Sequence, residues 1–362
     1  MTTHTYKFEI VAESKKTKAR AGILHTPHGK ILTPTFMPVG TQATVKGLTP
    51  DMLLNHETQI ILANTYHLSL RPGIDVIKSF GGLHEFMQWP HPILTDSGGY
   101  QVFSLSSNRK INPDGVTFKS HIDGSAHTFT PQSVIDLQLG FNSDIMMPLD
   151  ICSSYENNKK QTLSDMKTTH QWAKTARDYW QEKNVPNWLF GISQGGFHKE
   201  LRQESIAYLN ELDFPGYAIG GLSVGEPLEE LHDFITYCSP QLPKEKPRYV
   251  MGIGLPENLE CAIDQGIDMF DCVIPTRLAR HGQVFIGKKR VNIKLKKFKQ
   301  DTSPIDPTCT CYTCKQFSKA YLRHLFIAKE LLAYTLLSIH NIHTINTFVL
   351  TKRKQILTSS PT

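Results

Sequence analysis

The segment Pro92-Ile93-Leu94-Thr95-Asp96-Ser97-Gly98-Gly99-Tyr100 carries the pattern that decides the fold. A short apolar run, typical of a buried strand, ends in a carboxylate and is followed by Ser-Gly-Gly, which lets the backbone approach a ligand closely. Turns favour Asp, Asn and Gly anywhere, but turn preference explains poorly why five further predicted strands end in the same way. These strand ends are Asn64-Thr65-Tyr66-His67, Asp150, Gln194-Gly195-Gly196, Gly220-Gly221-Leu222 and Asp271.

Short β-branched runs alternate with helical patterns along most of the chain. Strands are predicted near residues 34–39, 59–63, 92–95, 144–149, 188–192, 217–219, 248–251 and 268–273, and helices near 49–56, 131–140, 163–183, 199–212, 228–238 and 256–265. This alternation predicts an α/β protein with a closed (β/α)8 TIM barrel, whose strand ends all open onto the face where the reaction site is built. The alternative is a doubly wound open sheet, but no glycine-rich dinucleotide or P-loop fingerprint follows the first strand. Residues 108–124 and 301–308, rich in Asn, Pro, Asp and Gly, are predicted to be loops or small excursions from the barrel.

The composition is that of a globular protein rather than a disordered one. Of 362 residues, 40% are apolar and 20% are charged, enough apolar side chain to offset the entropy of ordering the backbone. Residues 1–12 lack the basic segment and apolar run of a signal peptide, and polar residues interrupt the uncharged stretch 331–351. We therefore expect a cytoplasmic protein that does not enter the membrane.

The basic charge is concentrated near the C-terminus. Residues 277–362 contain 16 Lys and Arg against three acidic residues, a net charge of +13, which leaves −7 for residues 1–276. Such a segment suits a polyanion such as nucleic acid, and a solvated basic face is an equal alternative.

Three of the seven cysteines crowd into six residues: Cys309, Cys311 and Cys314. Without an export signal, this crowding favours metal binding over disulfides, and three thiolates supply most of a tetrahedral zinc shell. A helix predicted from residue 315 to about 342 offers the fourth ligand, with His324, His340 and His343 as candidates. We favour His340, because a distant ligand would pin the end of the helix onto the cysteine loop. Four protein ligands leave no open position, so we predict one structural Zn²⁺ per chain.

Asp96 and Asp271 are the candidate catalytic carboxylates. Asp271 lies in the otherwise apolar segment 269–275, where an unpartnered carboxylate would be costly to bury. Two carboxylates that face one sugar can act as nucleophile and as general acid/base, so substitution at a glycosidic carbon is a natural chemistry for the pair. The alternative is a structural ion pair between Asp271 and Arg277 or Arg280.

With these residues identified, the sequence resembles the bacterial tRNA-guanine transglycosylases, also called queuine tRNA-ribosyltransferases, over nearly its whole length. The motifs that carry the resemblance lie at residues 64–68, 70–73, 95–104, 194–196, 220–226, 251–254, 270–277, 309–314, 320–325 and 340–341. The resemblance implies a (β/α)8 barrel with a C-terminal zinc subdomain and selects His340 as the fourth ligand. We expect the barrel, with the catalytic site and base pocket, over residues 1–300, and the zinc-binding subdomain, with a C-terminal helix packed on the barrel, over residues 301–362.

The resemblance also implies an activity, the exchange of the wobble-position guanine (position 34) of GUN-anticodon tRNAs for a 7-deazaguanine, preQ1 or queuine. Asp271 would be the nucleophile that takes ribose C1′ as a covalent intermediate, and Asp96 the general acid/base. The implied base-binding residues are Tyr100, Asp150, Gln194, Gly221, Leu222, Glu226 and Met251. The implied contacts with the tRNA anticodon loop are Arg277, Arg280, Lys296 and Lys297. Members of the family commonly form homodimers.

The sequence departs from the usual bacterial pattern near the implied base pocket. Many relatives have an acidic residue before Cys152 and Thr-Pro after it, where this chain has Ile151 and Ser153-Ser154; Ser223 and Leu255 also replace commoner Ala and Thr. These changes leave open which base enters.

Three other functions remain to be weighed. The first is a catalytically silent RNA-binding subunit, which the presence of both Asp96 and Asp271 disfavours. The second is the archaeal relative that modifies another tRNA position; it has an additional C-terminal region, whereas here the sequence ends 22 residues after His340. The third is a metal-dependent barrel hydrolase, which would need metal ligands at the strand ends.

Overall fold

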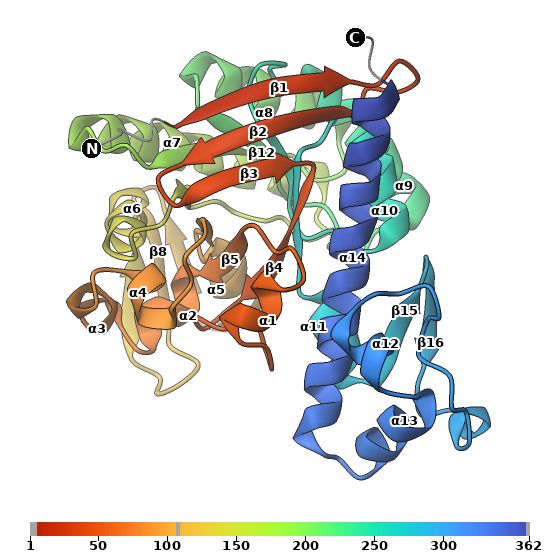
Figure 1. Cartoon of the computed structure of the whole chain (residues 1–362). Coiled ribbons are helices and arrows are strands. Elements are labelled where there is room, and N and C mark those ends of the chain that lie inside the picture. Colours follow the sequence, from red (N-terminus) through yellow and green to blue (C-terminus); the bar gives the residue numbers. More distant parts are fainter. Residues whose placement is uncertain (1–5, 106–108, 360–362) are drawn as a thin grey trace.

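The computed structural model describes residues 6–105 and 109–359 and contains the expected closed parallel barrel (Figure 1). The prediction of a (β/α)8 barrel is confirmed, and the open-sheet alternative is excluded because β14 pairs with β4. Around the barrel the strands are β4 (Thr35–Gly40), β5 (Ile61–Asn64), β6 (Ile93–Asp96), β10 (Ile145–Met146), β11 (Trp188–Ser193), β12 (Gly216–Ile219), β13 (Arg248–Val250) and β14 (Met269–Cys272).

Two hydrophobic cores lie on the two sides of the barrel wall. Leu94 and Met269 point into the barrel interior, whereas their neighbours Ile93 and Phe270 pack outward against the helices. Side chains alternate between the two faces along a strand. A residue two positions after an inward-facing residue therefore also faces inward, including the residue at the end of the strand.

Helices connect the strands and cover the outside of the barrel (Figure 1). They are α1 (Pro50–Leu54), α2 (Thr65–Leu70), α3 (Ile74–Ser79), α4 (Leu83–Met87), α5 (Gly99–Leu105), α6 (Pro131–Gly140), α7 (Lys159–Lys183), α8 (Lys199–Leu212), α9 (Leu228–Cys238), α10 (Pro256–Asp264) and α11 (Ile274–Arg280), with a 3-10 turn, η1, at Ser239–Gln241. Several start as their sequences indicate: Thr130 caps α6 with a capping box and a proline at the first helical position.

Three small antiparallel sheets were not predicted. One consists of β1 (Lys7–Glu13), β2 (Arg20–Thr26) and β3 (Gly29–Thr33), which lie across one end of the barrel, and another is the hairpin of β15 (Gln283–Ile286) and β16 (Lys289–Asn292). The third lies where the sequence predicted a loop or a small excursion from the barrel, and it shows that the excursion is a small sheet. Asn108 lies outside the described residues, but β7 (Arg109–Asn112) and β8 (Gly115–Lys119) pair with each other and with β9 (Ala126–Phe129), because Val116, Phe118 and Phe129 bury one face.

The prediction of a single helix from residue 315 to about 342 is wrong. The chain forms α12 (Tyr312–Gln316), α13 (Lys319–Ile327) and α14 (Leu331–Ser359), and the 3-10 turn η2 (Lys296–Phe298) precedes them. Ser318 ends the first helical run and caps the second through the Tyr321 N–H, and Lys329 adopts a left-handed conformation (φ 60°) before α14. Short polar caps therefore break a pattern that looked continuous. Residues 301–308 form the predicted loop.

Helix α14 runs from the C-terminal unit along the barrel to the N-terminal strands (Figure 1). Asn341 Nδ2 donates to the carbonyl groups of Pro275 (2.9 Å) and Gln283 (3.0 Å), which ties α14 to α11 and β15. Within residues 6–105 and 109–359, no helix combines the length and the apolar character needed to cross a bilayer.

Candidate active site and metal centre

A cavity of about 390 Å³ opens at the carboxyl ends of the barrel strands. Asp96 and Asp271 have the same parity as the inward-facing Leu94 and Met269, so both carboxylates point into the mouth of the barrel. The sequence-predicted residues that line this cavity are Asp96, Tyr100, Asp150, Gln194, Gly221, Leu222, Met251, Asp271 and Arg277. Side chains from six strand ends therefore meet in one place, as expected for a barrel.

Asp96 is held at the end of β6 by groups from the neighbouring strand end and from its own turn. Its Oδ2 accepts a hydrogen bond from Asn64 Nδ2 (2.5 Å), and its Oδ1 accepts from the backbone N–H groups of Thr65 (3.2 Å) and Gly98 (3.1 Å). Burial outweighs these bonds and, helped by the nearby charge of Asp271, raises the pKa of Asp96 to about 7. A carboxyl group with such a pKa can give and take a proton near neutral pH.

Asp271 lines the cavity, and one of its two carboxylate oxygens accepts two hydrogen bonds. Tyr249 OH and the backbone N–H of Gly252 (2.8 Å) both donate to Oδ1. Burial raises the pKa of Asp271, and the bond from Tyr249 opposes this effect. In the described part of the chain, no ion pair joins Asp271 to Arg277 or Arg280, so the structural-pair alternative is not realised.

At the other side of the cavity, Asp150 and Gln194 form a buried polar pair. Asp150 Oδ2 accepts from Gln194 Nε2 (2.7 Å), Asp150 Oδ1 accepts from Ser97 Oγ (3.1 Å), and burial raises the pKa of Asp150 to about 6. Gln194 Oε1 is buried without a hydrogen-bond partner among the described residues. Buried amide oxygens rarely stay unpaired, so this atom keeps the capacity to accept a hydrogen bond.

Gly221 is required where it lies. Its φ is +65°, and a Cβ there would come within 2.4 Å of Gln194 Oε1. A side chain at this position would therefore be strained and would displace the Gln194 amide.

The remaining predicted base-binding residues differ in position. Tyr100, on α5, is 55% exposed at the rim of the cavity, and Leu222 is buried in its wall. Glu226 does not line the cavity. Its carboxylate instead accepts hydrogen bonds from the backbone N–H groups of Ser223 and Val224 in its own loop.

Two residues at the site had no predicted role of their own. Asn64 bridges the two strand ends, because its Nδ2 bonds to Asp96 and its Oδ1 accepts the His67 N–H (2.9 Å). Its position after a predicted strand was the available signal. Tyr249 had no signal, because an aromatic residue in a buried strand indicates core; only the pairing of Tyr249 with Met269 brings its hydroxyl to Asp271.

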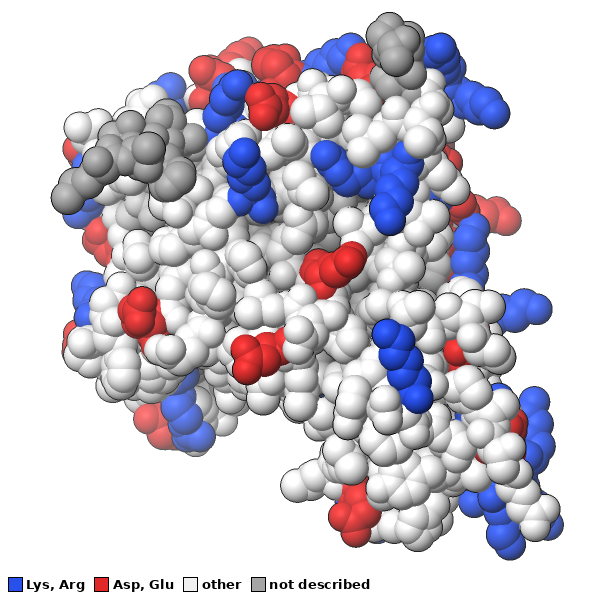
Figure 2. Space-filling view, in the orientation of Figure 1, with Lys and Arg blue, Asp and Glu red and all other residues white. Residues whose placement is uncertain are grey.

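Of the predicted RNA-binding residues, Arg277 lines the cavity, whereas Arg280, Lys296 and Lys297 do not. Arg277 is exposed on α11, and Arg280 is half-buried with Nη1 lacking a hydrogen-bond partner in the described structure. Lys296 and Lys297 are exposed on η2, with Lys297 Nζ 5.1 Å from the centre of the Phe298 ring. In Figure 2, Lys and Arg gather at the lower right, near the β15–β16 hairpin and the segment that follows it.

Cys309, Cys311, Cys314 and His340 form a compact candidate metal centre. Their four ligand atoms lie within 4.8 Å of one another, and the three Sγ atoms are 3.6, 3.6 and 3.3 Å from His340 Nδ1. Zinc bonds of about 2.3 Å to sulfur and about 2.1 Å to nitrogen, in a tetrahedron, require an S···N separation of about 3.6 Å. The donor set and spacing fit such an ion.

A backbone carbonyl group fixes the orientation of the His340 ring. Its Nε2 lies 2.6 Å from the carbonyl oxygen of Phe285 and donates to it, which leaves Nδ1 free to bind a metal. Cys311, Cys314 and His340 are buried, and only Cys309 is partly exposed. The residues present would hold a metal with four protein ligands.

A second His and carboxylate group lies at the opposite end of the barrel. Asp144, just before β10, is 2.8 Å from His28 Nδ1 and 3.2 Å from His84 Nε2, and the two imidazole rings stack 3.6 Å apart. Nearly parallel rings cannot both direct a lone pair at one ion, so this arrangement fits a hydrogen-bonded link to the N-terminal sheet. It does not provide the strand-end metal site that a barrel hydrolase needs.

The chain matches one family of known proteins over most of its length. The sequence model of the family described as "Queuine tRNA-ribosyltransferase" matches residues 14–360. Proteins named queuine tRNA-ribosyltransferase from Dictyoglomus turgidum and Caldanaerobacter subterraneus subsp. tengcongensis are 52% and 53% identical to this chain, over 92% and 93% of its length and 87% and 90% of theirs. The protein of that name from Ruminiclostridium cellulolyticum is 50% identical over 96% of this chain and 92% of its own.

The match extends through both the barrel and the cysteine cluster, and the relatives align over most of their own length. The chain therefore belongs to the queuine tRNA-ribosyltransferases, the tRNA-guanine transglycosylases of queuosine modification.

Proposed function

We propose that this chain exchanges the guanine at position 34 of GUN-anticodon tRNAs for a 7-deazaguanine through a covalent aspartyl-ribosyl intermediate. One observation carries the proposal: Asp96 and Asp271 line a single cavity with a buried carboxyl group and with an amide oxygen that has no hydrogen-bond partner among the described residues. That combination suits a sugar at one side and a purine edge at the other.

Asp271 is the nucleophile in this proposal. Its Oδ2 attacks ribose C1′, the C1′–N9 bond breaks, and the bonding electrons go to guanine N9, which takes a proton from Asp96. The incoming base then gives its ring N–H proton to Asp96 and attacks C1′, which restores the Asp271 carboxylate. Two displacements retain the configuration at C1′, and no ATP is needed because one glycosidic bond replaces another.

Asp150, Gln194 and the backbone N–H of Gly221 recognise the purine edge, and the ring stacks between Tyr100 and Met251. A pyrimidine would leave the buried polar groups unpaired, which disfavours it strongly. The Leu222 carbonyl and Glu226 meet the 7-substituent; Glu226 must exchange its hydrogen bonds to the loop amides to do so.

The basic residues Arg277, Arg280, Lys296 and Lys297 bind phosphates of the anticodon loop. The exposure of Arg277, Lys296 and Lys297 and the charge of +13 over residues 277–362 support this role. We assign the barrel with the catalytic site to residues 1–300, and the zinc-binding subdomain with its C-terminal helix to residues 301–362. The ion at the cysteine cluster is one structural Zn²⁺, which would hold α12 against α14 when bound. A substrate of this kind also favours a cytoplasmic location.

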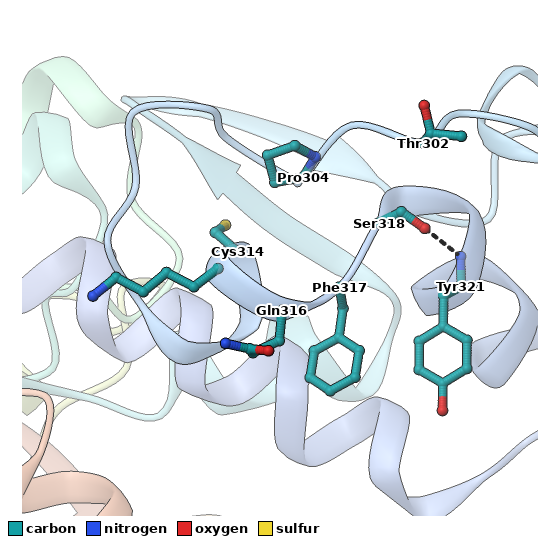
Figure 3. A pocket seen from close by; sticks show the side chains of 8 residues that line it. Thr302, Pro304, Cys314, Gln316, Phe317, Ser318 and Tyr321 are labelled. Atoms are coloured by element: carbon teal, nitrogen blue, oxygen red, sulfur yellow. Dashed lines mark hydrogen bonds between the residues drawn. The ribbon is translucent and has the colours of Figure 1, made fainter.

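We further propose that the chain forms a homodimer through the C-terminal subdomain. Large apolar side chains are exposed there: Tyr312, Tyr321, Ile327, Leu331 and Leu332. The rings of Phe317 and Tyr321 stack with centroids 5.4 Å apart, beside a surface hollow of about 630 Å³ (Figure 3). Clustered apolar surface of this kind favours a protein partner. Sedimentation equilibrium of the wild type and of Leu331→Glu tests the proposal, and an unchanged monomeric mass for both would reject it.

The activity is tested with tRNA that carries labelled guanine at position 34, incubated with the protein and excess 7-aminomethyl-7-deazaguanine. We expect release of label that requires the added base and is lost in Asp271→Asn. Asp264→Asn, at the end of α10 and outside the cavity, is the matched control. Release by Asp271→Asn at the wild-type rate would reject the mechanism.

A further inference from the structure

Arg202, on α8, is a buried cation to which the proposed function gives no role. Its side chain is 0% exposed, and among the described residues its guanidinium binds only backbone carbonyl groups. Nε donates to Gly196 (2.8 Å), Nη1 donates to Ser193 (3.1 Å) and Gly220 (2.7 Å), and Nη2 donates to Gly221 (3.2 Å). Because no carboxylate balances the charge at close range, burial lowers the pKa of Arg202. The guanidinium therefore holds these carbonyl groups at a cost in desolvation.

The four carbonyl groups belong to the carboxyl ends of two neighbouring strands, β11 and β12, which pair in parallel. These strand ends carry Gln194 and Gly221, two of the proposed base-binding residues. Gly220 and Gly221 are consecutive glycines, so side-chain sterics restrict the backbone between them very little. The contacts of this backbone with Arg202 therefore decide how its peptide groups are oriented.

The peptide group between Gly220 and Gly221 is the one that bears on the base. It is trans, so its carbonyl oxygen and its N–H point in opposite directions. Since the oxygen is directed at Arg202, the Gly221 N–H is directed away from it. Burial raises the pKa of the Cys152 thiol, which lines the cavity, and a hydrogen bond from the Gly221 backbone opposes this effect. A thiol is a weak acceptor, so a base oxygen can replace it.

We propose that Arg202 is a positioning residue for base recognition, which fixes this peptide group so that the Gly221 N–H donates to the carbonyl oxygen of the purine edge. Guanine has a single carbonyl oxygen, O6, and a backbone donor needs an acceptor. The charge of Arg202 also polarises the peptide group and strengthens its N–H as a donor. Arg202 does not line the cavity, so it acts through the backbone alone. The inference rests on the proposed function and adds a residue to it.

The test combines a change in the protein with a change of one atom in the base. 6-Thioguanine keeps the ring N–H groups of guanine, but its sulfur accepts hydrogen bonds more weakly than oxygen does. Incorporation of labelled guanine into tRNA gives kcat and the KM for guanine, and competition gives the inhibition constant of 6-thioguanine. We expect the wild type to favour guanine about three- to tenfold, the effect of one neutral hydrogen bond.

Arg202→Lys keeps the positive charge and loses the planar fork, so it cannot hold both strand ends. We expect KM for guanine to rise about three- to tenfold and the inhibition constant of 6-thioguanine to change less than twofold, so the preference for oxygen disappears. With saturating base, kcat should stay within about twofold, because Asp96 and Asp271 keep their own partners. Arg202→Gln should lose the same preference, and its neutral side chain avoids a poorly bonded buried charge if Arg202→Lys folds badly.

Arg248→Lys is the matched control. Arg248 is also buried, at 7% exposure, and its guanidinium donates to the carbonyl groups of Leu242 (2.6 Å) and Pro243 (3.1 Å), away from the cavity. This variant removes a similar structural contact, so it should lower the thermal stability and leave the preference for oxygen as in the wild type.

The possible failures are distinct. If the wild type incorporates no labelled guanine, the proposed function fails. If the wild type incorporates guanine but does not distinguish it from 6-thioguanine, the function stands and the role of Arg202 is rejected. The same holds if the Arg202 variants weaken both bases equally, or if Arg248→Lys reduces the preference as much as they do, because Arg202 would then support the fold alone.

Discussion

The cavity at the barrel mouth and the Cys309 cluster both gather polar side chains from distant parts of the chain, but their atoms face different things. At the cluster, the four donor atoms face one another within 4.8 Å, and the outer nitrogen of His340 is bonded to Phe285. At the mouth, Gln194 Oε1 has no partner within the described residues, and burial raises the pKa values of Asp96 and Asp150. One small ion would satisfy all four donor atoms of the cluster, whereas the polar groups at the barrel mouth still need a substrate as partner. We therefore expect substitutions at the cluster to affect metal content and stability, and substitutions at the barrel mouth to affect activity.

Asp271→Asn, at the barrel mouth, should have the largest effect on activity. The change keeps the shape and removes the attacking charge, so exchange should fall by about three orders of magnitude or more while folding, metal content and tRNA binding persist. A denaturing gel should show no protein–RNA adduct. Asp96→Asn should impair turnover yet still allow some adduct, and the opposite pattern would require the two roles to be exchanged.

Cys311→Ser removes one of the four proposed metal ligands in the cysteine cluster. Thiolate binding couples the metal to folding, so this variant should lose its zinc. The C-terminal subdomain should be destabilised by about 3 kcal/mol or more. Elemental analysis and thermal unfolding measure both effects. Cys261→Ser, on α10 away from the cluster, is the control and should retain one zinc per chain. Soluble, active wild-type protein without zinc would contradict the assignment.

Asp150→Asn, at the barrel mouth, should make the folded protein more stable. Burial raises the pKa of Asp150 from its ordinary value near 4 to about 6, so the folded state holds this proton more tightly than the unfolded state. Stability contributed by this group therefore falls as pH rises from about 4 to 6 and stays low above that range. At pH 8 the variant should be about 1–3 kcal/mol more stable in urea unfolding, and the gain should vanish near pH 4. A gain that is equal at both pH values would point to packing instead.

Tyr249→Phe tests how the nucleophile is tuned. The Tyr249 hydroxyl lowers the pKa of Asp271 against the effect of burial, so its removal should raise that pKa. The acidic limb of kcat/KM should then move to higher pH by about one unit, with activity recovering at alkaline pH. Tyr217→Phe, in β12 and bonded to the Phe214 N–H, is the matched control. A uniform loss of rate at all pH values would indicate a merely structural role.

Neutralising Lys296 and Lys297 together should have the smallest effect, confined to tRNA. Each lost phosphate contact flattens the slope of log affinity against log salt by about one unit, and binding of the free base should stay the same. Filter binding at several salt concentrations measures the slope. An unchanged slope would make these lysines part of a solvated face.

The sequence predicted the barrel because apolar strands and polar strand ends alternate regularly, and strand parity directs Asp96 and Asp271 into the mouth. It did not predict β1, β2 and β3, whose pattern depends on covering the end of a barrel that must already exist. Nor did it predict the break at Ser318, because one polar cap within a helical pattern is a weak signal. The role of Tyr249 depends on pairing between β13 and β14, which local sequence does not contain.

Helix α14 joins the last residues of the chain to the first strands. Arg353 Nη1 donates to the carbonyl oxygens of Gly22 (2.8 Å) and Thr33, more than 300 residues earlier in the sequence. During synthesis, the N-terminal strands and most of the barrel leave the ribosome long before this partner exists. These carbonyl groups therefore lack their side-chain partner until residue 353 has been translated. The docking of α14 on β2 and β3 is thus a contact of long sequence separation, and such contacts form slowly relative to local helices.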